Sequence, residues 1–129
     1  MEESLRLVLV EWLRSDGPLA GELNTVCEEA PARTSLPWLA IATSASTDWS
    51  TKTEIGREVR IALELHCRGD APGSAAALTA AIEARLARLP TSQAGFAVIS
   101  QRFLRARCEQ RAGNRRSILL EYAFRLLAN

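Results

Sequence analysis

The 129-residue chain has one histidine, three cysteines and few aromatic residues, which make up 5% of it. The cysteines, Cys27, Cys67 and Cys108, are widely spaced and form no CxxC pair, so a disulfide scaffold or a zinc site is a poor interpretation. Reduced, partly buried thiols are expected instead, as in a protein made in the cytosol. The formal net charge of +1 gives no overall field that favours nucleic acid or a membrane surface.

Long apolar runs and catalytic motifs are also missing. No segment approaches the roughly 20 apolar residues that span a bilayer, and the acidic Glu2 and Glu3 stand where a signal peptide carries basic residues. The EF-hand, P-loop, GxSxG and HExxH patterns do not occur. His66 and Cys67 are adjacent, so in a strand they point to opposite sides and cannot form a nucleophile–base pair. We predict no catalytic residue, no metal site and no cofactor, with His66 on the surface.

The length predicts a single domain over residues 1–129, and a hydrophobic content of 47% is typical of a soluble globular protein. Hydrophobic periodicity predicts helices over 3–15 and about 74–89, and a shorter helix is plausible near 19–27. Alternation predicts strands over 38–44, 56–67, 97–108 and 117–127. The order helix, strand, strand, helix, strand, strand predicts an α+β fold with a four-stranded, mainly antiparallel sheet. Both long helices are expected to cover one face, and a long loop joins the first two strands.

The apolar stripes of these elements predict the core. Its expected members are Leu63, Leu65, Leu78, Ile82, Leu86, Phe124 and Leu126. Each contributes about 1.5–3 kcal/mol on burial, before conformational entropy is counted. Trp12 and Trp38 are expected in the core or at its edge. The opposite face of the sheet is either solvated or an interface, and carries Arg60, Glu64, Arg105, Glu121 and Arg125.

A polar run at residues 46–54 connects the first two expected strands. It is longer than the usual strand connection of about two to five residues. It carries the indole of Trp49 and the single lysine of the chain, Lys52, and such loops often hold binding residues. Trp49 either folds back on its own hairpin or contacts another protein, where tryptophan is favoured at hot spots. The candidate interface residues are Asp48, Trp49, Ser50, Thr51, Lys52, Thr53, Glu54 and Arg57.

Six arginines gather in the last expected hairpin, and arginine binds phosphate well. They are Arg102, Arg105, Arg107, Arg111, Arg115 and Arg116. Exposed aromatic residues for base stacking are lacking there, apart from Phe103. A solvated hairpin end or an edge that contacts protein therefore explains the cluster better than a nucleic-acid site.

Three segments carry a resemblance to a known family: LPWLAI at 36–41, TDWSTKT at 47–53 and GREVR at 56–60. With the order of elements along nearly the whole chain, they resemble the tail-completion family of long-tailed phages and gene transfer agents, long listed as a domain of unknown function. The loop is the most specific part of the resemblance, because the remaining pattern can arise in many α+β domains.

The resemblance implies a structural role without enzyme activity or cofactor. Such proteins are similar to tail terminators, rings commonly of six subunits that cap the finished tail tube, end its polymerisation and join the tail to the head. The implied partners are further copies of the chain, the tail-tube protein and a head-completion or connector protein. DNA passes through the ring without specific binding, and no membrane is involved. The implied location is the head-proximal end of the tail of a phage-like particle, assembled in the bacterial cytoplasm.

Two further hypotheses stand beside the terminator. A head-side adaptor or stopper of the same particle has a similar size and α+β character, and its position in the particle would distinguish it. A small enzyme or nucleic-acid-binding module would use His66 or the arginines of residues 102–116. The long polar loop favours the ring, since a ring needs a heterologous contact that closes on itself.

Overall fold

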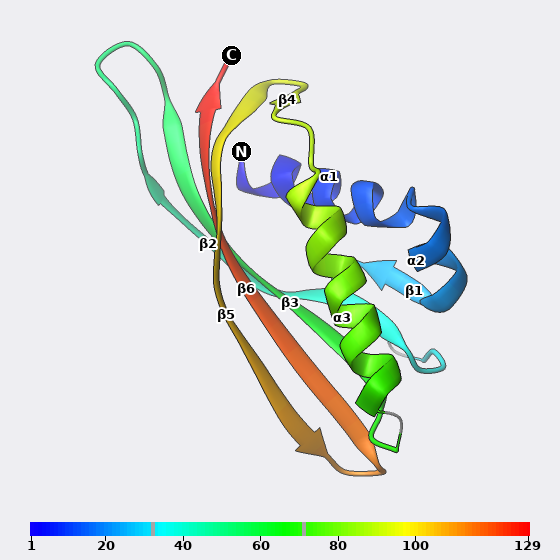
Figure 1. Ribbon diagram of the computed structural model, residues 1–129. Helices are drawn as coiled ribbons and strands as arrows, with labels where there is room; N and C mark the ends of the chain where they lie inside the picture. The colour runs from blue at the N-terminus through cyan, green and yellow to red at the C-terminus, as the bar shows by residue number, and fades with distance from the viewer. Residues whose placement is uncertain (32, 71) are drawn as a thin grey trace.

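The computed structural model describes residues 1–31, 33–70 and 72–129, which form a curled six-stranded sheet and three helices (Figure 1). The helices are α1 (Glu2–Arg14), α2 (Gly17–Glu22) and α3 (Pro72–Ala87). The strands are β1 (Thr25–Cys27), β2 (Trp38–Asp48), β3 (Gly56–Arg68), β4 (Ser92–Gln93), β5 (Phe96–Arg111) and β6 (Arg115–Ala128).

The strand order in the sheet is β1-β2-β3-β6-β5-β4. The pair β1–β2 is parallel, and the other neighbouring pairs are antiparallel. The prediction of a four-stranded sheet with the order α-β-β-α-β-β is therefore wrong. It missed β1 and β4, which have three and two residues and are too short for an alternating pattern to be recognised.

The sheet is strongly twisted and curls into a half-barrel, with the helices gathered on one side of it (Figure 1). Two of the long strands are bent by register shifts. One shift lies between Ile41 and Thr43 in β2, and two lie in β5. Such bulges increase the local twist of a strand. The curl leaves one sheet face against the helices, called here the helix face, and an outer face free of them.

The segment between α1 and β2 differs from the short helix expected near residues 19–27. α2 begins earlier because the Asp16 carboxylate accepts a hydrogen bond at 3.2 Å from the backbone N–H three residues on, and Pro18 suits a first helical turn. The chain then leaves the helix, and Thr25–Cys27 pairs with the start of β2. Pairing with a distant strand overrides local helix preference here.

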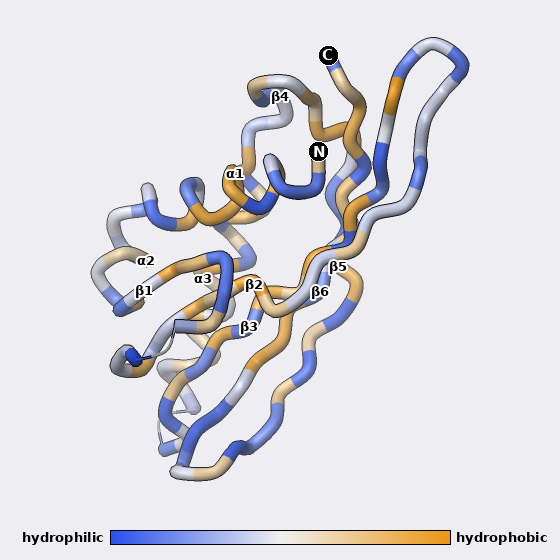
Figure 2. The backbone as a smooth tube through the Cα atoms, turned by 180° about the vertical axis from the view of Figure 1, so that it is seen from behind, coloured by the Kyte–Doolittle hydropathy of each residue, from blue (hydrophilic) through white to orange (hydrophobic). Residues whose placement is uncertain are grey.

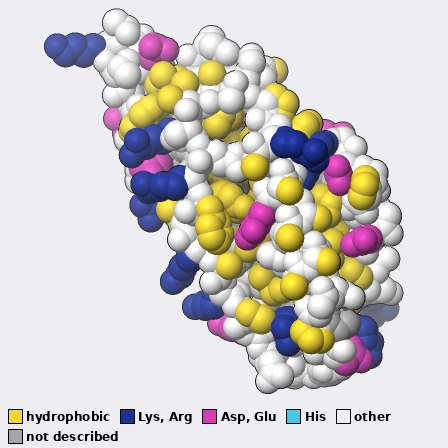
Figure 3. Space-filling model, viewed as in Figure 1, with side chains coloured by type: hydrophobic (Ala, Val, Ile, Leu, Met, Phe, Trp, Pro, Cys, Tyr) yellow, Lys and Arg dark blue, Asp and Glu magenta, His cyan; other side chains and the backbone are white. Residues whose placement is uncertain are grey.

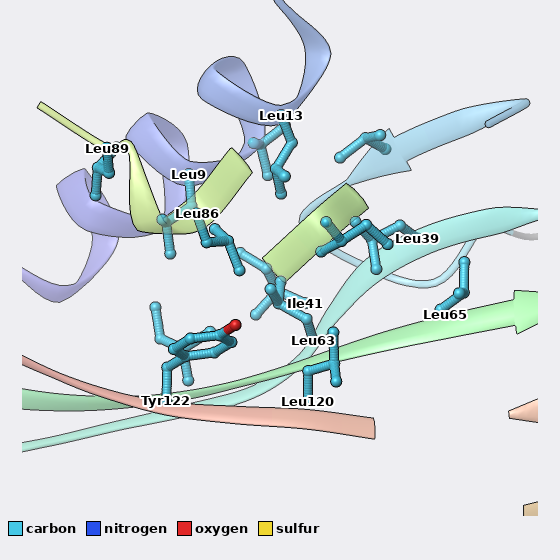
Figure 4. Close-up of a cluster of buried hydrophobic side chains, with 14 of the residues drawn as sticks. Leu9, Leu13, Leu39, Ile41, Leu63, Leu65, Leu86, Leu89, Leu120 and Tyr122 are labelled. Atoms are coloured by element: carbon cyan, nitrogen blue, oxygen red, sulfur yellow. The ribbon is translucent and has the colours of Figure 1, made fainter. Parts of the chain in front are cut away.

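The core lies between the helices and the helix face of the sheet. All seven residues predicted for it are buried, with Leu65, Ile82, Leu86 and Leu126 fully so. Figure 4 shows the leucines of α1 and α3 meeting those of β2, β3 and β6, with Tyr122 beside them. Trp12 packs against this core from its edge, which confirms that expectation. Trp38 is also buried, but it lies opposite His66 on the outer face and outside this cluster.

A pair of side chains, Trp12 and Arg85, joins α1 to α3. The indole Nε1 of Trp12 donates a hydrogen bond of 2.7 Å to the Arg85 carbonyl. Arg85 Nε donates in return to the Trp12 carbonyl at 2.9 Å, and its guanidinium carbon lies 3.3 Å from the centre of the indole ring. This reciprocal contact fixes the angle between the helices that cover the sheet.

We expect Arg85→Met to lower the free energy of unfolding by about 2 kcal/mol, because it removes the hydrogen bond from Arg85 Nε and the cation–π contact, while the bond from the indole to the residue 85 carbonyl remains. Arg88→Met is the matched control: it makes the same change three residues further on, at a side chain that is 67% exposed. The control is expected to cost less than about 0.5 kcal/mol. Urea unfolding of both variants measures the difference, and equal losses would contradict the role given to Arg85.

Candidate functional site

The polar segment predicted as an interface forms a projecting arm, defined here as residues 46–57. The loop within the arm is shorter than expected, because β2 continues to Asp48 and β3 begins at Gly56. The connecting loop is therefore residues 49–55. Figure 2 shows the arm extending past the body of the protein in largely hydrophilic colours.

The arm is ordered by hydrogen bonds of its own. The Trp49 N–H donates to the Gly56 carbonyl at 2.9 Å, and the Thr51 N–H donates to the Glu54 carbonyl at 2.9 Å. The Thr51 hydroxyl accepts from the backbone N–H groups of Thr53 and Glu54 at 3.3 and 2.9 Å. These bonds close the turn within the arm itself. At its base, the Ile55 carbonyl accepts a further hydrogen bond of 2.8 Å from the Ala128 N–H of β6, which attaches the arm to the sheet.

Gly56 closes the base of the arm by a close backbone approach. A Cβ atom at this position would lie 2.5 Å from the Trp49 carbonyl oxygen and 2.8 Å from that of Leu126. The Ser50 hydroxyl also accepts the Gly56 N–H at 3.0 Å and is 2.7 Å from an Asp48 carboxylate oxygen. Only glycine fits between the two carbonyls, so Gly56 sets how the arm leaves the sheet.

Trp49 is half-buried, and the Arg125 guanidinium of β6 lies 5.3 Å from the centre of its ring. Arg57 donates to the Ser46 hydroxyl at 3.0 Å across the hairpin. The other predicted interface residues are exposed: Asp48, Ser50, Thr51, Lys52, Thr53 and Glu54. The structure therefore brings the predicted residues together on one projecting element, with the indole at its base.

The sequence interpretation missed Ile55, whose side chain is 67% exposed. It was assigned to neither the polar run nor the following strand. The available signal was a lone β-branched apolar residue between Glu54 and Gly56, outside the alternating pattern of β3. An exposed isoleucine next to charged residues is a common composition for a contact surface.

The arginine cluster lies mainly on the outer face, where β5 and β6 pair. Its charge is partly compensated there, since Arg105 is paired with Glu121, and Glu109 lies 3.1 Å from Arg107 and 3.4 Å from Arg111. The same pairing holds the pKa of the Glu121 carboxyl below its usual value, because Arg105 donates to it. The result is a surface of mixed sign.

His66 was predicted on the surface, and this prediction is wrong: only 5% of the residue is exposed. It lies on the outer face as the alternation indicated, but Trp38 is its register partner on β2 and stacks on it, with ring centres 4.0 Å apart. The imidazole Nε2 is paired with the Glu64 carboxylate, and Nδ1 has no partner among the described residues. Burial lowers the pKa of His66 despite the Glu64 carboxylate, which raises it.

This shift makes stability depend on pH. Because the pKa of folded His66 lies below 6.5, the unfolded chain takes up the proton first as the pH falls. The free energy of unfolding is expected to decrease from about pH 7 to pH 5, and His66→Gln is expected to flatten the decrease. The pKa of Glu2 is lowered mainly by hydrogen bonds from Ser44 and Ser46, so this carboxyl adds a separate loss of stability as the pH falls below its ordinary pKa of 4.5. Urea unfolding across the range tests this, and equal slopes in both proteins would contradict it.

Within residues 1–31, 33–70 and 72–129, no cluster of three or more histidine, cysteine or acidic residues is placed to hold a metal ion. In the same part of the chain, no helix has the length and apolar character needed to cross a bilayer.

The fold is an α+β half-barrel with an ordered, solvent-exposed arm, the kind of element through which proteins bind one another. The family model described as "Tail completion protein gp17" matches residues 8–126, and the chain belongs to this family. The resemblance predicted from the sequence is confirmed. The chain is a structural protein of phage-like tails, and this membership argues against an enzyme.

A solved structure titled "Virion of native gene transfer agent (GTA) particle" contains a chain with the same fold. The TM-score is 0.78 at 21% sequence identity, and the match covers 97% of this chain and 95% of that chain. No curated protein matches the sequence.

Proposed function

We propose that the chain is a tail terminator. Copies of it form a ring, commonly of six, that caps the tail tube, ends tube polymerisation and joins the tail to the head connector. The partners are other copies of the chain, the tail-tube protein on one side and a head-completion or connector protein on the other. The DNA passes through the ring without specific binding. The ring stands at the head-proximal end of the tail, and assembly takes place in the bacterial cytoplasm.

The observation that carries this proposal is the arm. Its residues Thr51–Ile55 are all exposed, although hydrogen bonds within the arm fix their conformation. An ordered, projecting segment loses little conformational entropy on binding, which favours a specific contact. Membership in the tail completion family and the fold shared with a chain of a gene transfer agent virion support a particle component.

Imaging of assembled particles at side-chain detail tests the proposal. We expect a closed ring of this chain next to the tube, with the arm of each copy against its neighbour. Mass measurement of the purified chain adds a second test, with a ring mass expected in the presence of the tube protein. Density on the head side of the connector would favour an adaptor or stopper instead. Absence from the particle would exclude the terminator role.

A further inference from the structure

A shallow shelf lies beside α3, where the sheet extends beyond the helix. The residues that define the shelf here are Ala80, Glu83, Ala87, Phe103, Ala106 and Cys108. Two adjoining hollows of about 400 and 390 Å³ make it up, and both are lined by Glu83. In Figure 3 the surface beside α3 is largely hydrophobic and hollowed.

The shelf exists because α3 leaves β5 uncovered. On the helix face, Phe103 and Cys108 of β5 pair with Tyr122 and Ile118 of β6. The β6 residues are buried in the core, whereas Phe103 is 49% exposed and Cys108 is exposed. An apolar sheet surface next to an alanine-rich helix is a typical place for another protein element to pack.

The two hollows of the shelf differ in charge. Glu83 is the one charged side chain among the described residues lining the hollow of Phe103, whereas Arg107 and Arg116 also line the hollow of Cys108. Glu83 has no ion-pair partner among the described residues, and it lines the same hollow as Phe103. Burial of Tyr122, with a smaller contribution from the Glu83 carboxylate, raises the pKa of this tyrosine to about 12. The Phe103 end of the shelf therefore presents one carboxylate beside an exposed aromatic ring.

The arm carries the complementary groups. Lys52 is exposed and likewise has no ion-pair partner in the described part of the chain, and Ile55 is 67% exposed. A lysine for the carboxylate and an isoleucine for the phenyl ring match the Phe103 end of the shelf in both charge and polarity.

The arm of one molecule is badly placed to occupy its own shelf. It leaves the sheet between β2 and β3, whereas the shelf is on β5, with β6 lying between β3 and β5. The arm also projects past the end of the sheet, away from α3 (Figure 1). A contact between arm and shelf therefore joins two different surfaces of two copies, which is the heterologous arrangement that a ring requires.

We propose that the shelf receives the arm of a second copy of this chain, with Lys52 against Glu83 and Ile55 against Phe103. This inference rests on the proposed ring and names the surfaces that meet in it. Each copy then offers a free arm on one side and a free shelf on the other, so that every contact around the ring is the same.

Charge reversal tests the pairing. Lys52→Glu and Glu83→Lys are each expected to weaken self-association about tenfold, and the double variant is expected to recover most of the loss. Glu11→Lys is the matched control, because it reverses an exposed helical carboxylate outside the shelf and is expected to have no effect. Association is measured by sedimentation of the free chain and of the chain assembled on tubes. If the loss of self-association in the double variant equals the sum of the losses in the two single variants, the pairing is overturned.

A disulfide trap tests the location directly. Cys108 is an exposed thiol on the shelf, so Thr51→Cys is expected to form disulfide-linked ladders under mild oxidation in a Cys27→Ser background. Adding Cys108→Ser is expected to abolish them. If rings form in every variant but no Cys108-dependent ladder appears, the shelf is not the receiving surface, although the ring itself stands. If neighbouring copies in assembled tails do not touch, the ring and the arm–shelf contact are both overturned.

Discussion

Gly56→Ala is expected to lower the free energy of unfolding by about 3 kcal/mol, the upper range for overpacking a buried site. The added methyl would lie 2.5 Å from the Trp49 carbonyl oxygen and 2.8 Å from the Leu126 carbonyl oxygen. Both atoms belong to backbone that is held in place, since the Trp49 N–H bonds to the Gly56 carbonyl and Leu126 belongs to β6. The clash is therefore relieved only if the arm separates from the sheet. A decrease of roughly 10 °C in the melting temperature corresponds to this loss.

The arm is also expected to become a site of proteolysis, because opening at its base frees residues 49–55. Gly73→Ala is the matched control. A Cβ atom at Gly73 meets no atom within 4 Å, and the residue lies in the first turn of α3. Alanine is expected to be neutral there or to stabilise by about 0.5–1 kcal/mol. Thermal unfolding and limited proteolysis of both variants give the comparison. A Gly56→Ala protein that melts like the parent and resists protease would contradict the close approach.

The elements with long periodic patterns were predicted well from the sequence. The stripe of Leu78, Ile82 and Leu86 indicated α3, and the alternation around Leu63 and Leu65 indicated β3. These patterns can be recognised in a single sequence because each element buries one continuous face, so its apolar residues recur at a regular spacing. The number of strands was wrong, since β1 and β4 are formed by pairing with distant residues and bury too few side chains to leave a pattern.

The candidate site divides in the same way. The arm was predictable because polar residues in an unusually long connection are visible in the sequence alone. The burial of His66 was not, because it depends on which residue of β2 lies opposite, and that register is shifted by a bulge between Ile41 and Thr43. The shelf could not be predicted either, since Phe103 appears as an ordinary strand residue until the sheet is seen to extend beyond α3.

Replacing Trp49 by alanine, or Lys52 by glutamate, is expected to leave the fold intact and to prevent the joining of tails to heads. Both residues lie in the arm, outside the core, so each variant should cost about 1 kcal/mol or less in stability. Removal of a hot-spot aromatic contact worth about 2 kcal/mol weakens binding roughly 30-fold at each interface in Trp49→Ala, and the charge reversal in Lys52→Glu weakens it about tenfold. Because the same contact repeats around a ring, the deficit is multiplied, and few complete rings are expected.

Complementation of a deletion strain measures the effect, with the yield of joined particles and the distribution of tube lengths as readouts. Trp49→Phe and Lys52→Arg are the controls, since they keep an aromatic ring and a positive charge at the two positions. Tubes of abnormal length without heads are expected if the ring ends polymerisation, whereas tubes of normal length without heads indicate a role in joining alone. Normal particle yield from both Trp49→Ala and Lys52→Glu would remove the arm from the mechanism. The tube-length distribution thus separates the two activities proposed for the ring, ending polymerisation and joining the tail to the head. Only the ending of polymerisation acts before the head arrives, so only its loss changes the length of the tubes.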